Sequence, residues 1–478
     1  MDFSSASAWG ILYVASEWII RLVMLVVIPF RRSPEAAKGW LLLVLFLPWV
    51  GLVLYLIIGR PNYPRWRRER FARLPEVFRP IRQRLEQSIR LFHPKPIDAQ
   101  ATATNLVTNL GTLGLLGANA VDQLSDYDGA IDRLVADIDQ STNHVHLLYY
   151  IFADDATGQK VIAALARAAR RGVACRVLVD FLGSKRGWRS LADQMAAAGV
   201  AMHRMLPISF LRRKSARGDL RNHRKIAVID ARVAYTGSQN IVDSTFKPGM
   251  TFEELVVRVS GPVVLQLQAV FVADWFLETQ EVLDSPQNFP ELVGAGSVTA
   301  QVMPSGPDYL TANVERLVVS LVHSAQRRVV ITTPYFIPSE ALLHALDTAV
   351  RRGVEVHLVV SLIADQLLVS LAQRSYYEEL LAAGVHIHRY RERFLHAKHL
   401  STDDTVAVIG SSNLDMRSFM LNAEVSLVVY DASVAMRLRA QQERYFAGSE
   451  PLNKEEWAAR SGVSKVCENL ARLLSPLL

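Results

Sequence analysis

The chain of 478 residues begins with two apolar segments that are long enough to cross a lipid bilayer. Residues 39–58 are twenty positions without a charged side chain, and a helix of that length covers the ~30 Å hydrocarbon core. Residues 8–30 are also long enough, but they contain Glu17 and Arg21. These two residues lie four positions apart, so they share a helix face and can form an ion pair. The pattern predicts a transmembrane helical hairpin over residues 1–60.

Beyond a basic linker at residues 61–115, short apolar runs alternate with amphipathic segments. Apolar runs rich in β-branched residues predict strands, whereas apolar residues at helical spacing predict helices. The predicted strands are residues 146–152, 173–181, 328–336 and 354–361, and the predicted helices are residues 158–171 and 339–352. Strand–helix–strand units of this kind indicate an α/β fold with right-handed crossover connections.

The order of these elements is repeated within the chain. The tetrapeptide Arg-Arg-Gly-Val occurs at residues 170–173 and again at 351–354, each time between a predicted helix and a predicted strand. Proline and glycine residues cluster near residues 285–305, which is typical of a connection. The repetition predicts two tandem domains, at residues 116–290 and 291–478.

The positive charge of the chain is concentrated beside its apolar end. Residues 1–73 contain ten Lys and Arg but only four Asp and Glu, whereas the whole chain has a net charge of +7. This placement favours a membrane anchor over nucleic-acid binding, and the basic flank after residue 58 favours the cytoplasmic side for everything that follows. The two cysteines, Cys175 and Cys467, are too far apart in sequence to indicate a disulfide framework or a metal cluster.

The pattern H-x-K-x4-D-x6-G-S-x-N occurs once in each predicted domain. Its two copies are separated by 173 positions at every motif residue, so a chance match is improbable. The motif residues are His223, Lys225, Asp230, Ser238 and Asn240 in the first copy and His396, Lys398, Asp403, Ser411 and Asn413 in the second.

These residue types, brought together in one pocket, suit the chemistry of a phosphate ester. Strand alternation would place His223 and Lys225 on one face, and likewise His396 and Lys398. Lysine and asparagine side chains can hold the non-bridging oxygens of a phosphate, and lysine can neutralise their charge without a metal. One imidazole can attack phosphorus while the other protonates the leaving alkoxide. We therefore expect neither a metal nor a cofactor.

The duplicated motif resembles the paired HKD motifs of the phospholipase D superfamily, and the chain is most similar to the bacterial cardiolipin synthases. The resemblance covers essentially the whole chain, including the segments RRSPEAAKGW, YTGSQNIVDSTF and NLDMRSFMLNAE. It implies two tandem phospholipase D-like domains with pseudo-twofold symmetry, preceded by the transmembrane hairpin with spans at about residues 8–30 and 39–58.

The resemblance also implies a role for each site residue. His223 is implied to be the nucleophile and His396 the acid and then the base. Asp230 and Asp403 are implied to be structural supports, and Glu254 and Glu424 match the carboxylates that orient the histidines. Two positions depart from many relatives, because Ser238 stands where glycine is frequent and Glu254 where aspartate is frequent.

The implied activity is that of a membrane phosphatidyltransferase, which converts two phosphatidylglycerols to cardiolipin and glycerol through a phosphatidyl-histidine intermediate. The expected partners are phosphatidylglycerol and membrane lipids, with no nucleic acid. The expected location is the bacterial cytoplasmic (inner) membrane, as a multi-pass protein with cytoplasmic catalytic domains.

Four alternative functions remain open. A hydrolase of the phospholipase D type would use the same residues with water as the acceptor, and a scaffold would have the fold without the activity. A nuclease could use the basic residues before each motif to follow a nucleic-acid backbone; these are Arg212, Arg213, Lys214, Arg217, Arg221 and Arg224, then Arg389, Arg391 and Arg393. A metal site could use the crowded residues His386, His388, His396, His399, Asp403 and Asp404, but most of them have no counterpart in the first copy.

Overall fold

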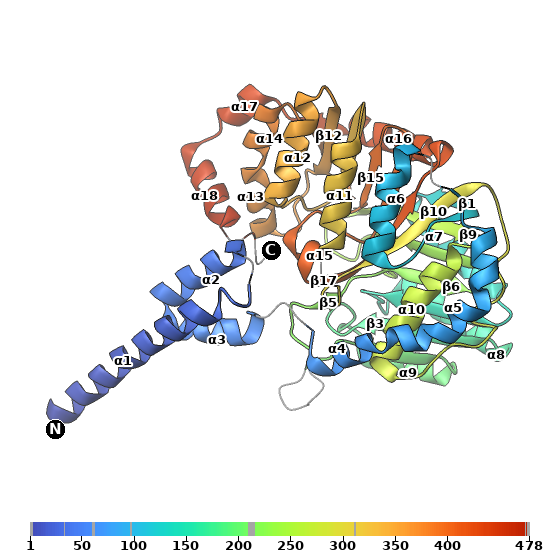
Figure 1. Cartoon of the computed structure of the whole chain (residues 1–478), viewed down its shortest axis with the longest axis horizontal. Coiled ribbons are helices and arrows are strands. Elements are labelled where there is room, and N and C mark those ends of the chain that lie inside the picture. Colours follow the sequence, from blue (N-terminus) through green and yellow to red (C-terminus); the bar gives the residue numbers. More distant parts are fainter. Residues whose placement is uncertain are drawn as a thin grey trace.

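The computed structural model describes residues 3–32, 34–59, 63–95, 98–208, 216–309, 312–473 and 475. Three apolar helices project from one side of an α/β body (Figure 1). They are α1 (Phe3–Val27), α2 (Pro34–Phe46) and α3 (Pro48–Ile58). Among the described residues, α1 is the one helix that is long and apolar enough to cross a membrane, over Trp9–Val27.

The second predicted span, residues 39–58, is divided into two shorter apolar helices. The helix breaks between Phe46 and Pro48, because proline has no backbone N–H to donate and its ring clashes with the preceding turn. The result is two shorter helices, and neither is long enough at 1.5 Å per residue to cross the hydrocarbon core.

The chain folds back at this break, so α2 and α3 form a closely packed hairpin. The rings of Trp40 and Tyr55 meet edge to face, with their centroids 5.3 Å apart. Nearer the turn, a Cβ on Gly51 would lie only 2.8 Å from the Val44 Cα, so glycine permits the close approach. The first and last residues of the hairpin therefore lie at the same end.

Arg21 joins α1 to the turn of this hairpin. Its Nη2 lies 3.3 Å from the Glu17 Oε2, which confirms the ion pair predicted within the first segment. Its Nε donates a hydrogen bond of 3.0 Å to the carbonyl of Leu45, in the last turn of α2. The carbonyls at a helix end have no partner within the helix, so Arg21 satisfies one of them inside an apolar environment.

The predicted linker is helical and packed against the body. It contains α4 (Arg65–Ala72), α5 (Leu74–Leu91) and α6 (Asp98–Gly111). The guanidinium of Arg67 is fully buried and forms ion pairs with Asp274 at 3.2 Å, Glu278 at 2.7 Å and Asp308 at 3.4 Å. The segment after α3 is thus tied to the interior of the protein.

The first half of the body alternates strands and helices. Its elements are β1 (Leu116–Leu124), α7 (Tyr127–Asp139), β2 (His144–Tyr149), α8 (Ala156–Arg170), β3 (Ala174–Asp180), α9 (Trp188–Ala197), β4 (Ala201–Met205), β5 (Arg221–Asn222), β6 (Ile226–Ile229), β7 (Val233–Gly237), β8 (Phe252–Glu253), β9 (Val256–Ser260) and α10 (Val264–Thr279).

The second half repeats this order and adds helices at its end. Its elements are β10 (Val298–Ser305), α11 (Asn313–Ser324), β11 (Arg328–Thr332), α12 (Glu340–Arg351), β12 (Glu355–Ser361), α13 (Leu367–Ser375), α14 (Tyr377–Ala383), β13 (His386–Tyr390), β14 (Phe394–Leu395), β15 (His399–Thr402), β16 (Val406–Gly410), α15 (Met416–Met420), β17 (Asn422–Val429), α16 (Ala432–Ala447), β18 (Ser449–Pro451), α17 (Lys454–Ala458) and α18 (Gly462–Arg472).

The two halves form one sheet that is symmetric about its centre. From the centre outward, the strands are β1-β9-β7-β6-β2-β3-β4 on one side and β10-β17-β16-β15-β11-β12-β13 on the other. The central pair, β1 and β10, is antiparallel. A shared core lies between the halves and contains, for example, Val257 and Phe271 from the first half and Leu427 and Leu438 from the second. The α/β fold with a repeated domain is confirmed.

The repeated tetrapeptide has one conformation in both halves. Gly172 and Gly353 have φ angles of +88° and +85°, between α8 and β3 and between α12 and β12. Residues with a Cβ rarely adopt this left-handed conformation, so glycine ends each helix and allows the chain to turn into the next strand.

Candidate active site

Each motif histidine is held in place by backbone from the opposite half of the chain. β5, which precedes His223, pairs with β17, and β14, which precedes His396, pairs with β8. The N–H of His223 donates to the carbonyl of Ala423 at 2.8 Å, and the N–H of His396 donates to that of Glu253 at 2.8 Å. The two short strands are therefore exchanged between the halves at the centre of the molecule.

The motif residues lie between strands rather than within them. Residues 223–225 follow β5 and precede β6, and residues 396–398 follow β14 and precede β15. Strand alternation was predicted to place each motif histidine and lysine on one face, and this explanation is wrong because the residues are not in strands. Instead, each lysine folds back toward its own histidine: the Nζ of Lys225 donates to the His223 carbonyl at 2.7 Å, and that of Lys398 donates to the His396 carbonyl at 2.6 Å.

The histidine–carboxylate pairs are also crossed between the halves. The Nδ1 of His223 lies 3.1 Å from both carboxylate oxygens of Glu424, and the Nδ1 of His396 lies 2.7 Å from the Oε1 of Glu254. Both imidazoles are 12% exposed, whereas the glutamates are buried. Because each Nδ1–H donates to a carboxylate, each Nε2 is the free nitrogen at the surface of the site.

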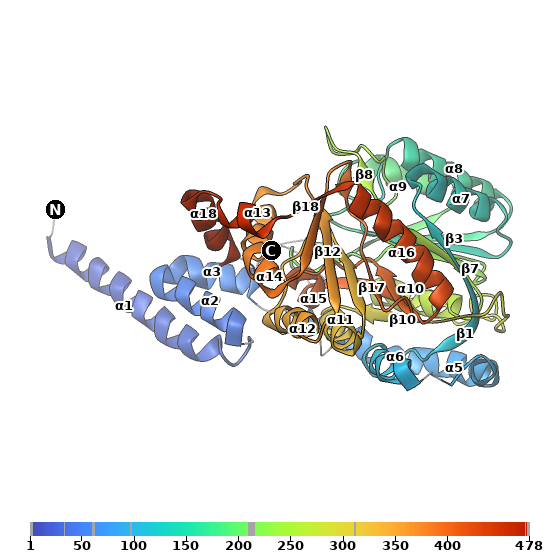
Figure 2. The same ribbon diagram turned by 90° about the horizontal axis from the view of Figure 1, so that it is seen from above.

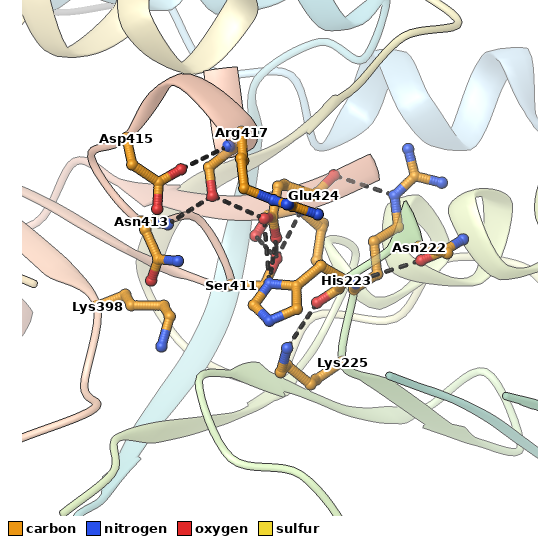
Figure 3. A network of polar contacts seen from close by, with 12 residues as sticks. Asn222, His223, Lys225, Lys398, Ser411, Asn413, Asp415, Arg417 and Glu424 are labelled. Carbon is orange, nitrogen blue, oxygen red and sulfur yellow. Dashed lines mark hydrogen bonds and ion pairs between the residues drawn. The ribbon is translucent and has the colours of Figure 1, made fainter. Parts of the chain in front are cut away.

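Hydroxyl groups hold Glu424 in its turn (Figure 3). The Oγ of Ser411 donates to the Oε2 of Glu424 at 2.5 Å, and the Oγ of Ser418 donates to the Oε1 at 3.0 Å. In the first half, Ser238 accepts from the N–H of Leu255 at 3.0 Å, as Ser411 does in the second half from the residue that follows Glu424. Ser418 was not predicted from the sequence. It lies on α15, within the NLDMRSFMLNAE segment.

The motif asparagines lie in corresponding places after β7 and β16. The side-chain oxygen of Asn240 accepts a hydrogen bond of 3.1 Å from the N–H of Ile151, at the end of β2. Asn413 is buried beside Lys398, and its N–H donates to the Oγ of Ser418 at 3.2 Å. The structure thus gathers histidine, lysine and asparagine from both motifs around the exchanged strands.

The motif aspartates lie away from the histidines, at the entrance to a strand. Asp230 accepts hydrogen bonds from the backbone N–H groups of Thr142, Asn143 and His144, at 2.7–2.9 Å. Asp403 accepts the corresponding bonds from residues 326–328 at 2.7–2.9 Å. Both aspartates have a φ of +52°, which this network stabilises. Their contacts hold β2 and β11 against the motif segments.

Burial lowers the pKa of both motif lysines. The pKa of Lys225 is lowered to about 7 and that of Lys398 to about 8, although the nearby carboxylates of Glu424 and Glu254 oppose the effect. An anion bound between the ammonium groups would raise both values, because it stabilises the charged form.

The histidines and their carboxylates shift in the direction that burial and pairing dictate. Burial lowers the pKa of His396 to about 4, and lowers that of His223 below its ordinary value, although the paired carboxylates oppose this. Burial would raise the pKa of Glu254 and Glu424, but their histidines and the lysines hold it below the usual range. Such an ionised carboxylate fixes the tautomer of its imidazole and stabilises the imidazolium.

A further support, missed from the sequence, lies behind the first motif. Arg224 forms a buried ion pair with Asp274 at 2.5 Å, and its Nε donates to the carbonyl of Glu424 at 3.0 Å. Asp274 also accepts from the side chain of Asn222 at 3.0 Å. The residues on both sides of His223 are therefore fixed through Asp274, the same carboxylate that pairs with Arg67 of α4.

The residues considered for a metal site are dispersed. His386 and His388 lie on β13, where His388 stacks on Phe446, whereas His399 stacks on Tyr445. Asp404 forms an ion pair with Arg439 at 2.9 Å. No group of three or more His, Cys, Asp or Glu side chains suited to a metal ion occurs in the described ranges.

Among the described residues, several of the basic side chains considered for nucleic-acid binding are buried or paired with carboxylates. Arg212, Arg213 and Lys214 lie outside the described residues. Arg221 and Arg224 are buried, and Arg221 lies 3.5 Å from Asp180. Arg389 and Arg393 form ion pairs at 3.3 Å with Glu450 and Glu253, respectively, so these guanidinium groups serve structural contacts.

Comparison with known proteins identifies the family of this chain. A family model described as the phospholipase D-like domain of cardiolipin synthase matches residues 134–275 and 318–446, one segment in each half. The chain belongs to the cardiolipin synthases of the phospholipase D superfamily. A second model, described as a phospholipase D-nuclease N-terminal region, matches residues 19–60, which include the hairpin of α2 and α3.

Relatives in this family match from end to end. Cardiolipin synthase A of Pectobacterium atrosepticum is 35% identical over 486 residues, which cover 100% of this chain and 99% of the relative. Cardiolipin synthase A of Erwinia tasmaniensis is 36% identical over 487 residues with the same coverage. The crystal structure of phosphatidylserine synthase from Haemophilus influenzae has the same fold, with a TM-score of 0.62 at 14% identity over 80% of this chain and 100% of that one.

Proposed function

We propose that this membrane protein converts two phosphatidylglycerols to cardiolipin and glycerol. The observation that carries the proposal is the pair of crossed His–Glu contacts, which occupies each Nδ1 and leaves each Nε2 available beside two buried lysines. The full-length similarity to cardiolipin synthases supports the choice of reaction. The enzyme needs no cofactor in this proposal, because lysine supplies the positive charge that the phosphodiester requires.

In the first step, the Nε2 of His223 attacks the phosphorus of one phosphatidylglycerol. A P–N bond forms and the P–O bond to glycerol breaks, while the Nε2–H of His396 gives its proton to the departing glycerol oxygen. The bound phosphodiester is an anion, so it raises the pKa of His396 from about 4 toward the range in which His396 can act as an acid. Lys225 and Lys398 hold the non-bridging oxygens.

In the second step, His396 removes the proton from a hydroxyl of the second phosphatidylglycerol. That oxygen attacks phosphorus, the new P–O bond forms and the P–N bond to His223 breaks. If water took this place, the product would be phosphatidic acid, and the enzyme would be a hydrolase. The acceptor therefore defines the activity.

We further propose that the protein lies in the bacterial inner membrane, with its catalytic halves on the cytoplasmic side. The apolar helix α1 and the basic residues that follow α3 support this location. A multi-pass arrangement would need residues 39–58 to cross as well, and the hairpin of α2 and α3 does not support that.

Product analysis tests the proposed reaction. Purified protein is given phosphatidylglycerol alone in detergent, and lipids and water-soluble products are identified by mass spectrometry. Cardiolipin and glycerol in equal amounts are expected. Phosphatidic acid and glycerol would instead indicate the hydrolase, and no lipid turnover would favour a nuclease or a scaffold. A His223→Asn variant serves as the inactive control.

A further inference from the structure

The C-terminal helix α18 exposes its apolar side chains. Val463, Val466 and Leu470, together with Leu473 just after the helix, have exposed fractions of 75%, 58%, 58% and 74%. Their spacing of three and four residues places them on one face. A surface helix of a soluble protein directs such a face toward the core, so the orientation of α18 is inverted.

Buried ion pairs hold α18 in this inverted orientation. On the opposite face, Glu468 has no exposed surface, although it is charged. Its carboxylate pairs with the Nε of Arg374 at 3.0 Å and with the Nε of Arg460 at 2.9 Å. Ser464, one turn before it, donates to the same carboxylate at 2.9 Å. A rotation of α18 about its axis that buried the apolar face would break the ion pairs of Glu468 and leave buried charges unpaired, so the pairs oppose such a rotation.

The neighbouring helix α13 extends the apolar surface. It packs against α18, and the two leucines of its first turn, Leu367 and Leu368, are 76% and 42% exposed. α13 follows β12, whose last residue, Ser361, accepts a hydrogen bond of 3.3 Å from the N–H of Leu395, next to His396. The apolar surface therefore lies at the end of the sheet that carries the second motif.

Both views of the molecule place α18 on the side from which α1, α2 and α3 project (Figures 1 and 2). The exposed faces of those helices are apolar as well. A protein anchored through α1 would present α18 to the same bilayer. Because the apolar face of α18 lies on the same side as the apolar helices, we take lipid as the partner of this face.

We propose that α18 and the first turn of α13 lie in the interface of the bilayer that α1 crosses, between headgroups and acyl chains. Helices that lie in this region bury one apolar face by a few ångströms and keep the other face polar. The contact would hold the second motif at the level of the lipid headgroups. The proposal rests on the membrane location given under the proposed function.

Depth-dependent quenching tests the contact in the full-length protein. A fluorophore is attached to L470C in a C467S background, and the protein is placed in vesicles of phosphatidylethanolamine and phosphatidylglycerol. Cys175 is buried and stays unlabelled. The matched control carries the fluorophore on M436C of α16, which is 56% exposed and lies away from α1, α2 and α3.

Quenchers on the lipid acyl chains should quench the label on α18 at least several-fold more than the label on α16, and aqueous iodide should do the reverse. Equal quenching of both labels would overturn the proposal. Quenching of L470C by a label on a second protein copy, without quenching by lipid, would also overturn it and assign the face to self-association. The measurement needs no turnover, so its outcome is independent of whether cardiolipin is formed.

A second experiment uses the variant V466D/L470D. The ratio of turnover on vesicles to turnover on detergent micelles should fall on the order of tenfold, because two charges must enter an apolar region. The control V293D/M436D changes two other exposed apolar residues and should keep the wild-type ratio. A normal ratio in V466D/L470D, in protein that unfolds at the wild-type temperature, would contradict the membrane contact.

Discussion

His223 hydrogen-bonds to Glu424 and His396 to Glu254, so each histidine depends on a carboxylate from the other half of the chain. Either histidine has the contacts that a nucleophile needs, because both are oriented through Nδ1 and free at Nε2. Only the reaction itself distinguishes the two histidines. The crossed pairing predicts that Glu424 supports the step of His223 and that Glu254 supports the steps of His396.

Replacing the two histidines should give opposite results in a trapping experiment. With a phosphatidyl donor that has an activated leaving group, His396→Asn should accumulate a phosphatidyl adduct on His223, because the base for the second step is missing. His223→Asn should accumulate none. Loss of acid–base assistance is worth about 10²–10⁴-fold, so turnover of natural substrate should fall by that amount in His396→Asn.

The carboxylates should follow their crossed partners. Glu254→Gln should resemble His396→Asn, and Glu424→Gln should resemble His223→Asn, in each case more weakly because only orientation and charge are lost. Peptide mapping by mass spectrometry locates the adduct. An adduct on His396 in the His223 variant would reverse the assignment, and Glu254→Gln without adduct would contradict the crossed pairing as a functional one.

The lowered lysine pKa values predict a decline of activity toward alkaline pH. A lysine whose pKa is about 7 or 8 is charged below that pH and neutral above it, so anion binding weakens as the pH rises. We expect kcat/KM to fall above about pH 7–8, and kcat to fall at a higher pH, because bound phosphodiester stabilises the charged lysines. A pH–rate profile with soluble short-chain substrate checks this. A constant kcat/KM from pH 7 to 9 would contradict it.

Charge neutralisation by lysine also predicts the effect of chelators. Turnover should be unchanged by EDTA, because Lys225 and Lys398 are placed to balance the phosphodiester charge from both motifs. Assays at several EDTA concentrations, with the detergent held constant, measure this. Complete loss of activity that one divalent ion restores would contradict the mechanism.

At the scale of single elements, α4 connects the membrane helices to the first motif. Arg67 pairs with Asp274, and Asp274 in turn pairs with Arg224 beside His223. Removal of one partner from a buried ion pair leaves the others unpaired, at a cost of about 3–5 kcal/mol. Asp274 therefore links α4, which follows the apolar helices, to Arg224 beside His223.

Two truncations and one point variant test the role of α4. Deletion of residues 1–60 should release the protein from membranes and leave turnover of dispersed lipid measurable, whereas deletion of residues 1–73 should abolish it. Arg67→Ala should lower the free energy of unfolding in urea by about 3–5 kcal/mol. The control Arg65→Ala, in the same helix, removes an exposed pair with Glu69 and should change it by less than about 1 kcal/mol. Equal effects of Arg67→Ala and Arg65→Ala would contradict this role.

The elements that the sequence predicted well are those with a local signal. Residues 158–171 and 339–352 correspond to α8 and α12, because helical spacing and a terminal glycine are visible within one short segment. Residues 39–58 were predicted as one helix because proline is tolerated in membrane helices, and sequence does not reveal whether the chain turns back. The fold-back depends on Gly51 meeting Val44, a contact that only the packed structure defines.

On the scale of the whole molecule, the two halves are one body. β1 and β10 join the sheet at its centre, and the exchanged strands β5 and β14 complete the opposite half. The motif spacing made the site residues predictable, since both copies carry the same pattern. The exchange of strands β5 and β14 between the halves was not predictable, because a short strand has the same sequence pattern whether it pairs within its own half or with the other half. Ser418 and Asp274 lie outside the repeated motif, so no pattern marked them.

The hairpin of α2 and α3 has a consequence for the topology of the proposed membrane location. A hairpin that entered and left the bilayer through one face would add no change of side, so α1 would be the one crossing among the described helices. In the proposed location, the start of α1 and the catalytic halves would lie on opposite sides of the membrane. Arg21 lies within the apolar segment Trp9–Val27 of α1, and its Nε donates to the carbonyl of Leu45 beside the turn of the hairpin.

A cysteine at Ser4, in a C467S background, should therefore react with a membrane-impermeant maleimide in intact spheroplasts. Under the same conditions M436C should react only after permeabilisation, because the proposed location puts α16 on the cytoplasmic side. If S4C also required permeabilisation, the chain would cross twice and the hairpin would open in the bilayer. An accessible S4C would place the first turn of α1 on the opposite side of the membrane from the catalytic halves.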